Sequence, residues 1–219
     1  MQKSTAENFQ KTLNSFYQAR GKDPSPDEGQ LLTAYEHTES LWWENLSRVR
    51  QVRYLLVGEA PLYGEKRAYI YNPETPGTAF LGKSTVEKLL LLKGREGQLS
   101  GKRAMLEAMR SLGLVVLDLF PFALNDRTQL TYARLSDADR EHLAAQCRSW
   151  HLRPKLEALQ EKASERLVCG VRYLRLEPFA RKVLESCVPN PETLQVELAC
   201  QRRANAPLDL ERLAARLAN

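Results

Sequence analysis

Acidic, aromatic and glycine residues stand at or near the ends of apolar runs in several parts of the chain. The segment Gly58-Glu59-Ala60-Pro61 directly follows one apolar run, Glu65 comes shortly after it, and Asp118 ends a second run. Phe80 lies between two glycines in the segment that separates these runs. Carboxylates placed in this way can stabilise a developing positive charge and orient water, and an aromatic ring can stack on a flat group. The spacing therefore predicts a catalytic or binding site that needs no metal ion.

The apolar runs that carry these residues are expected to be strands of a parallel sheet. Each is short and continuous, and is stopped by glycine, proline or a polar residue, as in strands buried on both faces. The expected strands cover residues 54–57, 114–121, 166–170 and 194–199. Because ligands of such sheets gather beyond the carboxyl ends of the strands, the loops after these strands are expected to share one cleft.

Helical periodicity fills the segments between the expected strands. The expected helices cover residues 5–20, 27–50, about 84–92, 101–112, 137–164, 174–187 and 208–217. The first two form an N-terminal helical pair at about 5–50. Strands that alternate with helices predict a three-layer α/β fold (αβα) with a central, mostly parallel four-stranded sheet. We expect a single domain over residues 1–219.

Local signals predict where some of these elements begin. Ser84 and Glu87 have the spacing of a capping box, with Ser84 as the cap of the helix that follows. Ser136 is expected to cap the helix over 137–164. The segment 63–80 is rich in glycine, proline and aromatic residues, so it is expected to be a loop with at most one short strand at 68–71.

Composition narrows the class of protein. The four cysteines lie far apart and the three histidines do not cluster with carboxylates, so we expect buried thiols, no metal ion and no cofactor. The chain has neither an apolar stretch of membrane-spanning length nor an initial secretory signal, so a cytoplasmic monomer without membrane contact is expected. A net charge of +5 and a pI near 9.0 are compatible with DNA binding without requiring it.

In order and spacing, these segments resemble the motifs of the uracil-DNA glycosylase superfamily. The resemblance covers about residues 53–185 and is greatest to the branch whose first motif is G-E-A-P-G. It implies that family's fold and a DNA glycosylase that flips one base out of DNA and hydrolyses its glycosidic bond. It further implies that Phe80 stacks on the flipped base, that Asp118 recognises the base edge, and that Glu59 or Glu65 places the attacking water.

The resemblance also implies which residues surround the base and the DNA. The base-binding residues that it implies are Gly58, Ala60, Pro61, Tyr63, Phe80 and Asp118. Two further groups are expected to contact DNA. Lys83 and Ser84 stand at a helix N-terminus, where a phosphate can bind. Gln201, Arg202 and Arg203 stand in the last loop, where arginines can contact phosphates or enter the minor groove.

Three positions depart from the family pattern. Ala60 stands where the uracil-specific branch carries its water-activating carboxylate, which moves that role to a neighbouring glutamate. Asp118 stands where uracil-specific enzymes carry asparagine. An ionised carboxylate only accepts hydrogen bonds, so Asp118 favours the exocyclic amine of a cytosine-like base, and a 5-modified cytosine is the sensible target. The family's terminal H-P-S loop is replaced by a segment that contains Gln201-Arg202-Arg203.

Other interpretations of the same residues stay open. The segment 77–84 also matches the phosphate-loop pattern G-x-x-x-x-G-K-[ST], which would make the chain a nucleoside-triphosphate-binding protein with Asp118 near a magnesium ion. The proline-containing segment before it argues against this interpretation. A third possibility is a relative without catalysis that binds DNA or a protein through the same cleft. Glu59 can also be a helix cap, Phe80 a core residue and Asp118 a partner of a neighbouring loop. The biological role, DNA repair or defence against foreign modified DNA, is open as well.

Overall fold

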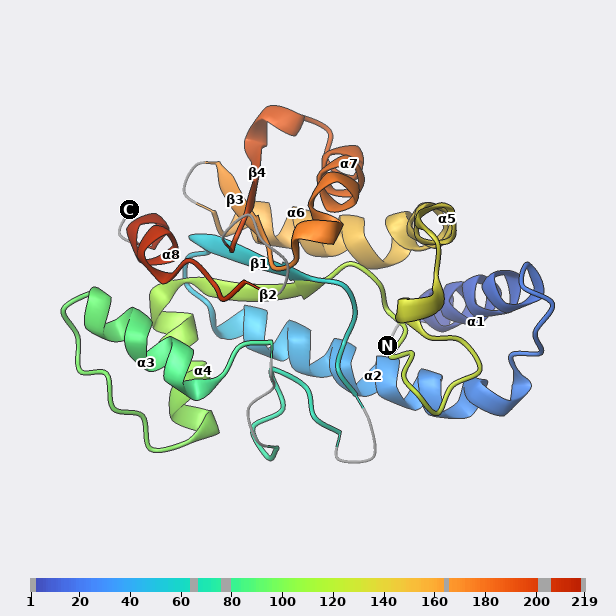
Figure 1. Ribbon diagram of the computed structural model, residues 1–219, viewed down its shortest axis with the longest axis horizontal. Helices are drawn as coiled ribbons and strands as arrows, with labels where there is room; N and C mark the ends of the chain where they lie inside the picture. Colours follow the sequence, from blue (N-terminus) through green and yellow to red (C-terminus); the bar gives the residue numbers. More distant parts are fainter. Residues whose placement is uncertain (1–2, 64–66, 76–79, 164–165, 201–205, 218–219) are drawn as a thin grey trace.

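The protein is built around four parallel strands, seen here in a computed structural model (Figure 1). The structure describes residues 3–63, 67–75, 80–163, 166–200 and 206–217. The strands lie in the order β2-β1-β3-β4. Their bounds are β1 Tyr54–Gly58, β2 Leu114–Asp118, β3 Leu167–Val171 and β4 Leu194–Leu198. All pairs are parallel, which confirms the predicted sheet.

Helices cover both faces of the sheet and complete three layers (Figure 1). α2 and α4 lie on one face, and α6 and α7 lie on the other, so the predicted αβα arrangement is confirmed. The helix bounds are α1 Lys3–Gln18, α2 Ser25–Arg48, α3 Lys83–Leu92, α4 Lys102–Leu112, α5 Asp137–Cys147, α6 Arg153–Glu161, α7 Glu177–Cys187 and α8 Leu210–Arg216. α1 and α2 are the expected N-terminal pair, and α1 also packs against α5. None of the described helices is long and apolar enough to cross a membrane.

The core is continuous across the two interfaces between helices and sheet. Strand residues such as Leu55, Leu56 and Val57 are fully buried, because β1 is an inner strand with helices on both faces. All four cysteines are buried and unpaired, as predicted. The inner strand β3 has a glycine, Gly170, at its point of contact with Tyr54 of β1. A Cβ atom at this position would overlap the Tyr54 hydroxyl, so the Tyr54 side chain can lie against β3 because residue 170 is glycine.

Both outer strands have backbone groups that are bonded to side chains. On β2, Trp42 Nε1 donates a hydrogen bond to the Val116 carbonyl at 2.9 Å, and the Tyr71 hydroxyl bonds to the Val116 carbonyl and amide. On β4, Arg166 and Arg181 donate to the carbonyls of Leu194 and Val196, each at 2.8 Å. The Val116 amide and the carbonyls at these positions therefore have partners within the chain.

The helix starts test the capping predictions, and one of the two is wrong. Ser136 caps α5 and forms a full capping box with Asp139, as predicted for a serine at this position. Ser84 does not cap, because α3 already begins at Lys83 and has Gly82 as its N-cap without a side-chain bond. Glu87 instead accepts the Leu99 amide at 3.0 Å. A hydrogen bond to the distant Leu99 thus replaces the bond that Glu87 was expected to make at the start of its own helix.

The described residues around 68–71 form no strand, which agrees with the expectation of a loop with at most one short strand. Another expectation is corrected by the structure. The single helix expected over 137–164 is divided by a π-helical segment, Arg148–Leu152. Pro154 is the second residue of the next helix, and because it has no N–H and its ring would clash with the carbonyl of residue 150, a regular α-helix cannot continue through it.

Candidate functional site

Gly58, Phe80 and Asp118 meet at the carboxyl ends of the two neighbouring strands β1 and β2. Gly58 and Asp118 are paired in register. A Cβ atom on Gly58 would lie 2.9 Å from Asp118 Oδ1 and 3.1 Å from Phe80 Cε2. Because residue 58 has no Cβ atom, the Asp118 carboxyl and the Phe80 ring can both lie next to it. The structure therefore brings together the aromatic and acidic residues that the spacing predicted at one place.

Asp118 is a partly buried carboxyl whose side chain has no hydrogen-bond partner among the residues that the structure describes. Burial raises its pKa from 3.8 to about 7, and the nearby Lys155 ammonium limits this rise. The hydroxyls of Tyr69 and Tyr71 lie close enough for the Asp118 charge to add to the effect of burial, which raises their own pKa values. At neutral pH the carboxyl is thus available both in an accepting and in a donating form.

A buried chain of polar side chains lies behind Asp118. His151 Nε2 lies 3.2 Å from the Asp118 carbonyl, and His151 Nδ1 lies 3.4 Å from Lys155 Nζ. Lys155 in turn pairs with Glu39 at 2.6 Å. Burial, aided by the Lys155 charge, holds the pKa of His151 well below its usual range. The ring is therefore neutral, accepts from Lys155 and donates to the Asp118 carbonyl.

This Glu39–Lys155–His151 chain was not predicted from the sequence. A histidine and a lysine four residues apart are common on exposed helices, and only burial distinguishes this pair. Both side chains are almost completely buried, with relative exposures of 3% for His151 and 4% for Lys155. A signal was present, because Lys155 stands among apolar residues in the stretch that becomes α6.

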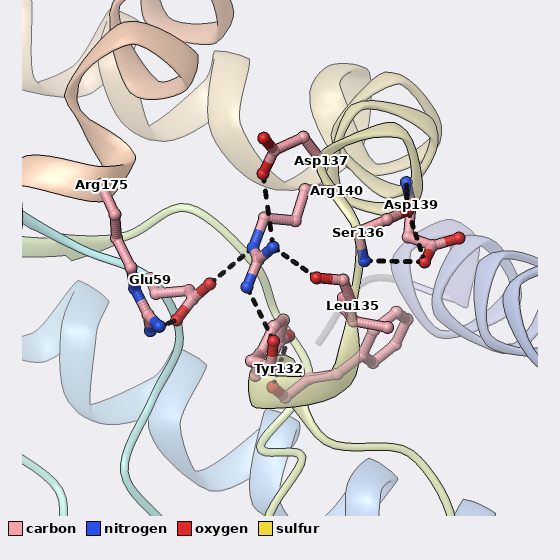
Figure 2. Close-up of polar contacts among 9 residues, drawn as sticks. Glu59, Tyr132, Leu135, Ser136, Asp137, Asp139, Arg140 and Arg175 are labelled. Atoms are coloured by element: carbon pink, nitrogen blue, oxygen red, sulfur yellow. Dashed lines mark hydrogen bonds and ion pairs between the residues drawn. The ribbon is translucent and has the colours of Figure 1, made fainter.

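Glu59 is held by two arginines rather than left open (Figure 2). Its Oε1 accepts from Arg140 Nε at 2.9 Å, and its Oε2 accepts from Arg175 Nη2 at 3.1 Å. The Glu59 carbonyl also accepts the Phe120 amide at 3.0 Å. Both carboxylate oxygens thus have cationic partners, which is the geometry of a structural ion pair.

Arg140 is the buried partner in this arrangement, with a relative exposure of 7%. Its guanidinium also donates to the carbonyls of Leu135 and Tyr132, at 2.6 and 2.7 Å (Figure 2). Arg140 thereby ties the start of α5 to the loop after β1. The sequence does not reveal this role, because Arg140 lies 81 residues after Glu59 and in the middle of a charged segment.

The remaining residues of the first loop lie in different surroundings. Pro61 is buried and Ala60 packs against the core. The Tyr63 hydroxyl lies 2.9 Å from His37 Nδ1 of α2, and the two rings meet edge to face. Tyr63 also lines a pocket of about 350 Å³ together with Arg67 and Asn125. Gly58, Phe80 and Asp118 do not line this pocket.

The expected DNA-contacting residues are only partly described. Glu65, Gln201, Arg202 and Arg203 lie outside the described residues. Ser84 is exposed at the start of α3. Lys83 Nζ donates to the Leu99 carbonyl at 2.9 Å and pairs with Glu87 at 3.3 Å, so it is engaged within the protein.

Three residues at the end of β3 were not predicted as part of the site. Tyr173 lies edge to face against Phe80, with ring centroids 6.2 Å apart. Arg172 Nη1 donates to the Ala206 carbonyl at 3.0 Å, and its guanidinium lies 5.3 Å from the Tyr173 ring. Arg175 is 61% exposed beside Glu59. The described part of the site thus has one guanidinium beside Tyr173 and another beside Glu59.

The phosphate-loop interpretation lacks the strand that it requires. In the described residues between β1 and α3 there is no strand that leads into the glycines of 77–84. The Lys83 ammonium, which would have to reach a phosphate, is bonded to Leu99 and Glu87. The described residues also contain no group of three or more His, Cys, Asp or Glu side chains arranged to hold a metal ion.

Comparison of the chain with protein-family models, with curated proteins and with solved structures gives no match.

Proposed function

We propose that the protein is a DNA glycosylase that hydrolyses the bond between a flipped base and its sugar. The observation that supports this most is the meeting of Phe80 and Asp118 above Gly58. A flipped base needs an aromatic surface for its face and a polar group for its edge, in a place where the backbone can approach closely. In this proposal Phe80 stacks on the base, and Asp118 bonds to its edge.

The contacts of Glu59 bear on which carboxylate places the attacking water. Two arginines bond to the two carboxylate oxygens of Glu59, so neither oxygen is left free to orient water or to face a cationic sugar. We therefore assign the water to Glu65, and we assign to Glu59 the positioning of its loop. In the reaction, water adds to the anomeric carbon while the bond to the base nitrogen breaks. The electron pair leaves with the base, and a proton of the water passes to the carboxylate.

The protonation of Asp118 determines which base its carboxyl fits. The ionised form only accepts hydrogen bonds and suits an exocyclic amine, as in cytosine and its 5-modified forms. The protonated form has one donor and one acceptor, like the amide of asparagine, and suits the edge of uracil. Since the pKa is about 7, both forms are present near neutrality. We propose a modified cytosine as the substrate above this pH.

A base-release experiment tests the proposal. Duplex and single-stranded DNA containing uracil, cytosine or a 5-modified cytosine is incubated with the protein at pH 6 and pH 8, and free base is measured. We expect release of a cytosine-type base at pH 8 and a larger share of uracil at pH 6. Phe80→Ala and Asp118→Ala should each abolish release. Absence of release from every substrate would contradict the proposal.

A second candidate function is DNA binding without catalysis. The ion pairs of Glu59 favour this second function. A protein that does not catalyse base release needs no free carboxylate at this position, so Glu59 can serve to hold its loop in place. This candidate predicts that the protein binds DNA through cationic residues such as Arg172 and Arg175 and that no base is released. Measured affinity for DNA in the same experiment separates the two functions. For either function we propose a monomer that acts inside the cell, where DNA is present.

A further inference from the structure

A pocket of about 420 Å³ lies between helices, and it shares with the candidate site only Glu39, the far end of the polar chain behind Asp118. It is bordered by α1, by the middle of α2, and by the π-helical segment with the start of α6. Two indoles and two carboxylates line it together with small hydroxyl groups. These residues are Trp43, Trp150, Glu36, Glu39, Ser40 and Thr5.

The sequence of α2 places four of these residues on one face. Glu36, Glu39, Ser40 and Trp43 are spaced by three, one and three positions, which is the repeat of one helical face. Trp150 comes from the π-helical segment that precedes Pro154. π-helical turns widen a helix locally and are frequent at functional sites. The pocket is therefore formed by one face of the regular helix α2 and by the π-helical segment that precedes α6.

The charges in and beside this pocket are negative on balance, in a chain whose net charge is +5. Glu36 is exposed and has no hydrogen bond or ion pair among the residues that the structure describes. Glu39 accepts from Trp43 Nε1 at 2.8 Å and from Lys155 Nζ at 2.6 Å. Two carboxylates against the single ammonium of Lys155 leave one negative charge. The carboxylate of Glu36 beside two indoles is suited to a cation.

The same region already holds one ammonium group within the chain. Lys155 Nζ pairs with Glu39 and lies 5.0 Å from the centre of the Trp42 ring. A carboxylate and an indole of α2 thus bind an alkylammonium from the protein's own α6. Glu36 and Trp43 offer the same two kinds of group toward solvent, with no partner from this chain described for the carboxylate of Glu36.

We propose that this pocket binds an alkylammonium group, a primary or methylated amine on a short carbon chain, through the indoles of Trp43 and Trp150 and the carboxylate of Glu36. The carbon chain packs on the indoles, and the charged end lies near Glu36. Both a free amine and the side chain of a lysine carry this chemistry. The proposal does not depend on base excision, and its failure would leave the proposed function untouched.

Tryptophan fluorescence of the full chain tests the proposal directly. Two of the three tryptophans line the pocket, while Trp42 is 1% exposed and contributes a constant background. We expect a saturable change on titration with n-butylammonium, with a dissociation constant on the order of 1 mM. N-acetyl-lysine methylamide is titrated in parallel. If this lysine derivative binds as tightly as n-butylammonium, the natural ligand is a lysine side chain. If it binds more weakly, the natural ligand is a free amine.

Variants on one helix provide the matched control. Glu36→Gln is expected to weaken n-butylammonium binding about fivefold, the effect of losing one exposed charge pair. Trp43→Leu should remove most of the binding. Glu44→Gln removes the same charge from an exposed position of α2 that does not line the pocket, and it should leave binding unchanged.

Three results would overturn the proposal. One is an equal fluorescence change with n-butanol, which has the same chain length and no charge. Another is an equal loss of affinity in Glu36→Gln and Glu44→Gln, which would show a general charge effect. The last is the lack of any saturable change up to about 20 mM n-butylammonium, a concentration well above the expected dissociation constant.

Discussion

Asp118 is the residue whose environment has the clearest physical consequence. It lies at the end of β2 in a place that removes most of its contact with water, and the described residues give its side chain no hydrogen-bond donor. The Lys155 ammonium offsets only part of this cost. A carboxyl kept in this state disfavours its own ionisation, and such groups are frequent where a protein binds a ligand.

This environment predicts how stability depends on pH. The pKa of Asp118 is 3.8 in an exposed chain and about 7 in the fold, so between these values the unfolded state loses a proton that the folded state keeps. The contribution of Asp118 to stability is therefore fully present below about pH 4 and is lost as the pH rises to 7. Asp118→Asn removes this loss. At pH 8 the variant should be more stable than the parent by at most about 4 kcal/mol.

Urea unfolding of both proteins at pH 5 and pH 8 measures this difference. The gain from Asp118→Asn should be larger at pH 8 than at pH 5, and other titrating groups cancel because they are common to both proteins. A loss of stability of equal size at the two pH values would show that Asp118 is ionised in the fold and has a favourable partner.

At the scale of elements, the Glu59 ion pairs join the loop after β1 to α5 and to the segment before α7. Arg140 is buried and its guanidinium bonds to Glu59 and to two carbonyls, whereas Arg175 is largely exposed and bonds to Glu59 alone. Buried and exposed ion pairs differ strongly in their effect on stability when one partner is removed. The two arginines therefore provide a natural comparison on the same carboxylate.

Arg140→Met is expected to lower the free energy of unfolding by about 3 to 5 kcal/mol, because it leaves a partly buried carboxylate and two carbonyls without their donor. Arg175→Met should lower it by less than about 1 kcal/mol. Denaturant unfolding at pH 7 measures both. Similar effects of the two variants would mean that the guanidinium of Arg140 contributes no more than an exposed charge.

Strand packing gives a second expectation at this scale. Gly170→Ala places a methyl group where the Tyr54 hydroxyl lies, and that hydroxyl is itself bonded to Glu197 at 3.3 Å. Overpacking of this kind costs about 1 to 3 kcal/mol. Thermal unfolding should show this loss, and Tyr54→Phe in the same chain should restore part of it. Gly29→Ala inside α2 is the control, since a Cβ there meets no atom within 4 Å and alanine favours a helix more than glycine does. Equal effects at both glycines would contradict this account.

The sequence predicted these elements where the signal is local. Continuous apolar runs gave all four strands to within one or two residues at their first residue, and Ser136 gave the start of α5. The pairing of Gly58 with Asp118 followed from the rule that parallel strands end at one edge, whereas the place of Phe80 was implied by the family resemblance. Predictions failed where a distant residue competes with the local signal. Glu87, for example, bonds to Leu99 instead of the helix start.

For the whole molecule, the partners of charged side chains were the least predictable part. Arg140 lies 81 residues from Glu59, and Lys155 lies 116 positions after Glu39. Their pairing depends on how α2, α5 and α6 pack around the sheet, and no local pattern contains that information. The candidate site was therefore predicted in its position and its central residues, while the groups that set its charge were found only in the fold.

The bonded edges of the sheet limit how this molecule can associate with others. Another chain adds a strand to a sheet by bonding to the free amides and carbonyls of an outer strand. The amide and carbonyl of Val116 on one side, and the carbonyls of Leu194 and Val196 on the other, already have partners from Trp42, Tyr71, Arg166 and Arg181. These positions are therefore less available to the strand of a second copy, which disfavours the joining of two folded copies into a continuous sheet.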